Sequence, residues 1–130
     1  MPTPDIPGYT IGAPPATPTV TFDGQGSTPT AGTTFLLNVP YGGQIKSVTI
    51  SGDVSGSAVV DIWVAPYPTV PTIGNTITAS AKPTLSSQQV NQDTTLTGWT
   101  KTIMPDSNII FRLDSASTLT RVTVILEVVV

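Results

Sequence analysis

From about residue 19 onward, short apolar runs alternate with turn residues. In the clearest run, 118–129, apolar residues recur at every second position, and Arg121, Thr123 and Glu127 occupy positions between them. A period of two is the mark of a half-buried strand. The pattern predicts strands near 19–23, 33–39, 44–51, 57–65, 95–103, 108–114 and 118–129, with a possible short one near 73–79. No window shows the 3.6-residue period of an amphipathic helix.

Turn residues separate these runs. Glycine supplies positive φ and Pro-Asp presets a turn, and such residues cluster at 41–43, 51–56, 66–68 and 104–108. Seven or eight short strands with frequent turns predict an all-β fold, a two-sheet antiparallel sandwich of jelly-roll or Greek-key type. The long polar segment 66–94, with four prolines, is expected to be the loop that crosses between the sheets.

The inward-facing positions of these runs predict the core. We expect it to contain Phe35, Leu37, Ile50, Val60, Ile62, Trp99, Phe111, Leu113, Val122, Val124 and Leu126. Asp61 and Arg112 interrupt apolar strands. They could form an ion pair that sets strand or subunit register, but alternation favours both side chains pointing to solvent.

The first 18 residues are rich in proline, which fixes φ and removes a backbone donor. They are therefore expected to form an extended arm rather than a helix or a central strand. The interpretation divides the chain into an arm, 1–32, and a β-sandwich domain, 33–130. Ile6, Tyr9 and Ile11 are apolar residues in this arm. We expect them to contact a partner, although a floppy terminus is the ordinary alternative.

Composition narrows the classes of partner. Only 10% of the 130 residues are charged, against roughly 25% in an ordinary domain, and this suits a surface packed against other protein. The net charge of −3 and five scattered basic residues argue against nucleic acid. The start lacks the basic and apolar stretches of a signal peptide, and no apolar run is long enough to predict a membrane span. Synthesis in the cytoplasm of the producing cell is expected.

Candidate chemistry is sparse. The chain has no His and no Cys, which removes the commonest general base and metal ligands. Carboxylates remain, but most of them lie in turns, so a hydrolase with paired carboxylates is disfavoured. We expect no catalytic residues, no metal and no cofactor. Trp63, Tyr67 and Trp99 could form a sugar-binding platform, although a Trp in an apolar strand is more often a core residue.

Four segments together resemble a domain found in virion proteins of tailed bacteriophages. They are SGSAVVDIW at 55–63, ITASAKPTLS at 77–86, LTGW at 96–99 and FRLDSASTLTRVT at 111–123. The resemblance covers roughly residues 40–130. It implies a β-sandwich virion protein, used in capsid decoration or in head or tail fibres.

Between these uses, the short domain with an extended arm and no shaft favours a capsid decoration (cement) protein. Such a protein would bind the outer surface of the shell and stabilise contacts between subunits of the major capsid protein. The resemblance also implies self-association, most often as a homotrimer. The alternative is a receptor- or glycan-binding module of a fibre.

Overall fold

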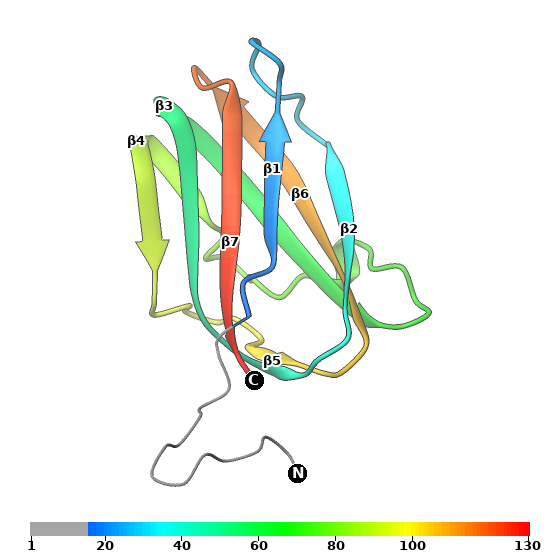
Figure 1. Ribbon diagram of the computed structural model, residues 1–130. Helices are drawn as coiled ribbons and strands as arrows, with labels where there is room; N and C mark the ends of the chain where they lie inside the picture. Colours follow the sequence, from blue (N-terminus) through cyan, green and yellow to red (C-terminus); the bar gives the residue numbers. More distant parts are fainter. Residues whose placement is uncertain (1–15) are drawn as a thin grey trace, which may run out of the picture.

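The computed structural model describes residues 16–130, which form an antiparallel all-β body (Figure 1). The prediction of an all-β antiparallel fold is therefore confirmed. Its elements are β1 (Thr19–Asp23), β2 (Thr34–Val39), β3 (Gly43–Pro66), the single-turn 3₁₀ helix η1 (Ile73–Asn75), β4 (Thr84–Asp93), β5 (Thr102–Ile103), β6 (Ser107–Ser117) and β7 (Arg121–Val129).

The strands form one rolled sheet rather than the expected two separate sheets. Its main path runs β1-β7-β3-β6-β2, and β4 and β5 pair with β3 off this path. The sheet nearly closes into a barrel, with β1 and β2 as the two ends of the path. A tilted contact between the rings of Phe22 and Phe35, with centroids 5.3 Å apart, joins these two strands across the remaining seam.

The roll depends on β3, which is one 24-residue strand where two separate strands were predicted. Its first half pairs with β7, its second half pairs with β6, and β4 follows it through the bend between them. Gly52 and Gly56 lie at this bend. A Cβ on Gly52 would come 2.8 Å from the Leu119 side chain, and a Cβ on Gly56 would come 2.7 Å from the carbonyl oxygen of Ser117. Gly56 therefore requires glycine because the clash is with backbone, whereas at Gly52 the tip of the Leu119 side chain would have to move.

Period two predicted most strands correctly, including 19–23, 108–114 and the final run. Three further predictions differ from the structure. The expected crossing loop contains β4, a strand with polar residues on both faces that has only Leu85 buried and gives no apolar alternation. The expected strand 95–103 is mostly a turn, and only its last residues pair, as β5. The possible strand near 73–79 is η1 followed by an isolated bridge between Thr76 and Trp63.

The interior holds most of the predicted core. Ile50, Val60, Ile62, Trp99, Phe111, Leu113, Val122, Val124 and Leu126 are buried as expected. Leu37 is half-buried and packs against this core. Phe35 is a correction: it is 41% exposed, because it lies on the edge strand β2 and only one side of its ring meets Phe22.

Residues 19–23, which the sequence interpretation assigned to the arm, form β1. The strand pairs with β7, from Thr19 opposite Ile125 to Asp23 opposite Arg121. Just before β1, Ala16 and Val128 exchange two backbone hydrogen bonds of 2.8 Å. The chain therefore enters the body beside the end of β7, at the end of the barrel that also carries β5.

The different burial of two phenylalanines generates a prediction. Phe111→Ala should lower the free energy of unfolding by about 3–5 kcal/mol, because the ring is fully buried and leaves a cavity. Phe35→Ala is the matched control and should cost under about 1.5 kcal/mol, since its ring is partly solvated and mainly loses the contact with Phe22. Urea unfolding of both variants measures the difference. Equal losses would contradict the placement of Phe35 on an open edge.

Candidate functional site

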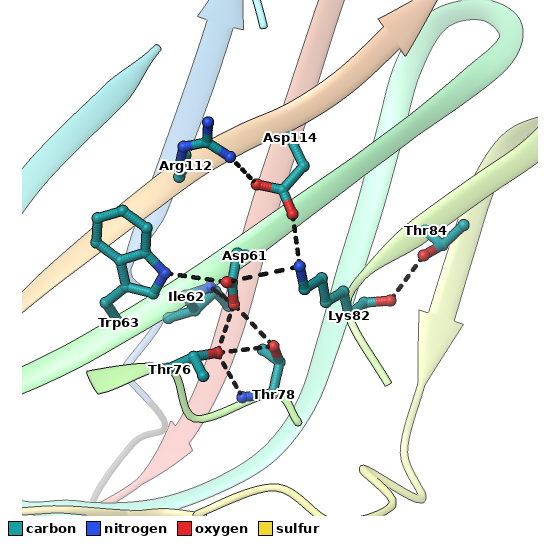
Figure 2. Close-up of polar contacts among 9 residues, drawn as sticks. All are labelled: Asp61, Ile62, Trp63, Thr76, Thr78, Lys82, Thr84, Arg112 and Asp114. Atoms are coloured by element: carbon teal, nitrogen blue, oxygen red, sulfur yellow. Dashed lines mark hydrogen bonds and ion pairs between the residues drawn. The ribbon is translucent and has the colours of Figure 1, made fainter. Parts of the chain in front are cut away.

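The densest polar cluster surrounds Asp61, in the second half of β3 (Figure 2). Asp61 is only 2% exposed. Its carboxylate accepts hydrogen bonds from the indole N–H of Trp63 (3.0 Å), the hydroxyls of Thr76 (2.6 Å) and Thr78 (2.8 Å), and the backbone N–H of Ile62 (2.8 Å). The expectation that this side chain points to solvent was wrong, because the segment around Thr76 and Thr78 covers this face of β3.

The environment of Asp61 keeps it charged. Burial is the largest single influence and raises its pKa, but hydrogen bonds from Thr76, Trp63, Thr78 and the Ile62 backbone together outweigh it. The net pKa lies below the usual value for an aspartate. Asp61 therefore has a structural role as a hydrogen-bond acceptor, because the four donors around it already bond to its carboxylate.

Lys82 joins Asp61 to a second carboxylate. Its ammonium nitrogen lies 3.7 Å from Asp61 and 2.7 Å from Asp114. The hydrogen bond to Asp114 raises the pKa of Lys82; burial opposes this, and the attraction of the two carboxylates adds to it. Arg112 closes the chain of charges by donating to the other oxygen of Asp114. Although Arg112 and Asp61 are direct cross-strand neighbours, the alternative of an ion pair between them is not formed, and these contacts take its place.

The cluster therefore holds two anions and two cations in alternation. Both carboxylates are engaged by cations or donors, so neither is poised as a nucleophile or a general base. Within residues 16–130, no group of three or more His, Cys, Asp or Glu side chains could hold a metal ion. The arrangement instead fastens the segment 76–84 to β3 and β6.

The sequence analysis missed the role of a second carboxylate. Asp53 lies at the bend of β3 and accepts hydrogen bonds from the backbone N–H groups of Thr120 (2.9 Å) and Arg121 (3.0 Å), as well as from the Thr120 hydroxyl. These bonds lower its pKa to about 2. They tie the bend to the turn between β6 and β7. Sequence suggested only that Asp53 forms a turn, because its partners lie far along the chain.

The aromatic side chains proposed as a sugar platform do not form one. Trp99 is buried, and its indole N–H donates to the carbonyl oxygen of Ala81 (2.8 Å). Trp63 is half-buried and its indole is held by Asp61. Tyr67 alone of the three is largely exposed. The three side chains therefore do not share an exposed stacking face.

Apolar side chains reach the surface at several places instead. At the end of the barrel where the chain enters, a groove of about 210 Å³ is lined mainly by apolar groups, among them Val64, Pro66, Ile77 and Met104. Other large apolar side chains are exposed along β2, in the loop before η1 and at the first residue of η1: Phe35, Leu36, Tyr67, Val70 and Ile73. Singly exposed apolar residues are ordinary on a protein surface, so the groove is the stronger candidate for a contact site.

The predicted arm contacts, Ile6, Tyr9 and Ile11, lie outside the described residues. In the part of the chain that the structure describes, no helix is long and apolar enough to cross a membrane.

Comparisons with known proteins add little. No protein-family model matches the chain, and no curated protein matches it. Among solved structures, it is similar to a chain of the "Structure of infectious bursal disease virus Gx strain", with 15% identity and a TM-score of 0.30. The match covers 92% of this chain and 37% of the viral chain, so this protein spans little more than a third of that length. A likeness of this size does not extend to function.

The charge cluster generates a stability prediction. Asp61→Ala should lower the free energy of unfolding by about 2–4 kcal/mol, because it leaves buried donors and Lys82 without their acceptor. Asp114→Ala, which removes a more exposed carboxylate, is the matched control and should cost about 1 kcal/mol. Chemical denaturation compares the two. A loss at Asp61 no larger than that at Asp114 would show that burial does not make Asp61 the main acceptor of the cluster.

Asp53 generates a pH prediction. Its folded-state pKa of about 2 is below the unfolded value of about 4. The carboxylate therefore stabilises the fold above pH 4, and this contribution disappears as the pH falls from about 4 to about 2. Asp53→Asn lacks the titrating group, so the difference in Tm between wild type and variant should be largest near pH 6 and shrink toward pH 2. A difference independent of pH would refute the role of the charge.

Proposed function

We propose that this protein decorates the capsid of a bacteriophage, binding the outer surface of the shell and stabilising contacts between subunits of the major capsid protein. The resemblance of segments within residues 40–130 to phage virion domains motivates the proposal. The structural observation that supports it is the apolar end of the barrel, where the chain enters at Ala16. A partner bound by the arm would lie beside this surface.

Several groups at this end favour a protein partner. Met104, Val129 and Val130 are exposed there, next to β5 and the end of β7. The groove lined by Val64, Ile77 and Met104 also includes Thr102 of β5. Apolar contacts of this kind at the centre of an interface contribute most of its binding energy. An arm and a body that bind neighbouring shell subunits would oppose their separation.

The proposed partners are the major capsid protein and further copies of this chain, with neither nucleic acid nor a membrane involved. The resemblance implies a homotrimer, located on the virion surface after synthesis in the host cytoplasm. In this proposal, the protein acts by binding and catalyses no reaction. The two tryptophans do not support the alternative of a glycan-binding fibre module, because Trp99 is buried and the indole of Trp63 is held by Asp61.

Two measurements test the proposal. Quantitative mass spectrometry of virions should find this protein in hundreds of copies, in a simple ratio to the major capsid protein. A few dozen copies would favour a fibre or vertex component, and absence from the particle would refute a virion role.

The arm should be needed for attachment. Replacing Ile6, Tyr9 and Ile11 together by Ser should weaken binding to undecorated shells by at least about 100-fold, because it removes three apolar anchors, each contributing about 1–2 kcal/mol. Replacing Thr3 and Thr10 by Ser is the matched control and should leave binding unchanged. Co-sedimentation with shells measures both. Unchanged binding of the triple variant would remove the arm from the interface.

A further inference from the structure

The apolar groove lies at the end of the barrel that carries β5 (Figure 1). Val64 and Pro66, from the end of β3, line it together with Thr102 and Met104, from the chain around β5. Ile77 also contributes to the lining. An apolar cavity of about 150 Å³ is large enough to hold benzene. The groove, at about 210 Å³, therefore has room for one aromatic side chain.

A row of paired residues connects this groove to the point where the described chain begins. Ala16 exchanges two backbone hydrogen bonds with Val128 of β7. The next residue of β7, Val129, lies opposite Gln44 of β3, and Gln44 lies opposite Thr102 of β5. Gln44 also donates to the Thr102 hydroxyl (2.7 Å), and Val129 is 39% exposed. The row is therefore a surface track from Ala16 to the groove, with an exposed apolar residue on it.

The arm residues that precede Ala16 are long enough to follow this track. Neighbouring strands lie about 4.8 Å apart, so the three spacings from Ala16 across β7 and β3 to β5 cover about 14 Å. Tyr9 lies seven residues before Ala16, and this length spans about 22 Å at the polyproline rise of about 3.1 Å per residue. Pro14 and Pro15 favour such an extended form. Tyr9 can therefore reach the groove with length to spare, whereas Ile11, five residues before Ala16, reaches only the track.

We propose that the arm of this chain docks on its own body, with the ring of Tyr9 in the groove between β5 and the end of β3, and with Ile11 over Val129. A tyrosine suits this site because its ring is apolar and its hydroxyl can stay at the wet rim, where Thr102 is exposed. The contact would cover apolar groups that the body otherwise exposes, including Met104.

The short tether favours the chain's own arm over the arm of another copy. A short flexible tether gives the arm an effective concentration on the order of 1 mM at the groove. A second copy present at about 1 μM is then at roughly a thousandfold disadvantage. The contact therefore needs only modest affinity, and it stays intramolecular at ordinary protein concentrations.

This contact belongs to the free chain and does not rest on the proposed function. If both hold, binding to a shell requires the arm to leave the groove, since Tyr9 cannot contact two surfaces at once. The arm would then keep Tyr9 and Met104 covered until a shell subunit displaces it. The test uses the free protein, so a negative result would refute the contact without bearing on shell binding.

Cross-linking can report where the arm lies, because the chain has no cysteine. Thr10→Cys combined with Thr102→Cys keeps Tyr9 and should form an intramolecular disulfide under mild oxidation. Thr10→Cys with Lys46→Cys is the matched control, because Lys46 is exposed on β3, one strand nearer to Ala16. Docking should make the first pair react about tenfold faster or more, whereas a free tether favours the nearer site. Non-reducing electrophoresis and mass spectrometry measure the rate and the linkage.

The ring of Tyr9 should account for this difference in rate. Adding Tyr9→Ser to the first pair should lower its rate to that of the control, and adding Tyr9→Phe should preserve it, since the ring remains. Equal rates for the two pairs, or a fast rate that survives Tyr9→Ser, would overturn the proposal. A disulfide between two chains would also overturn it, and would assign the groove to the arm of another copy.

The methyl resonance of Met104 gives a second readout without cysteines. A tyrosine ring beside Met104 should shift this resonance, so Tyr9→Ser should move it, and Thr10→Ser, the matched control, should not. The position of the resonance should be the same at low and high protein concentration, because the docking is intramolecular. A Met104 resonance that Tyr9→Ser leaves in place would refute the contact.

Discussion

The bend of β3 is the constraint on which the rest of the body depends. β6 and β7 follow each other in the chain, yet they do not pair together, because they lie on opposite sides of β3. The turn between them must therefore cross the bend. Leu119 fills the space that Gly52 and Gly56 leave, and Asp53 binds the backbone of Thr120 and Arg121. Together these contacts convert a flat meander into a rolled sheet.

This constraint explains which parts of the fold were predictable. Period two identified β6 and β7 because each has one face in the core. The period-two pattern divided β3 in two because Gly52 and Gly56 resemble turn residues. Their contact with Leu119 cannot be recognised from the neighbouring sequence. The pattern missed β4, whose pairing with β3 uses backbone bonds and requires no apolar face. Side-chain periodicity reports burial, so strands held mainly by their backbones escape it.

The charge cluster was unpredictable for a related reason. Asp61 occupies an outward position on β3, where a carboxylate usually meets water. It is buried because Thr76, Thr78 and Lys82 arrive from a segment that periodicity assigned to a loop. The sequence analysis identified Asp61 and Arg112 as unusual within apolar strands, and this signal was correct. It could not identify their partners, because Lys82 and Asp114 act only through the folded arrangement.

Because several charged side chains bond to one another or to the backbone, few charges remain free on the surface. The chain has only five Lys and Arg and eight Asp and Glu. Asp61, Lys82, Arg112 and Asp114 neutralise one another, and Asp53 serves the bend. Few charges remain to repel a neighbour or protect an edge, so hydration falls to Thr, Ser, Asn and Gln. Long-range repulsion between copies is weak on such a surface. Exposed apolar residues, among them Leu36 of β2 and Met104 after β5, therefore decide what it contacts.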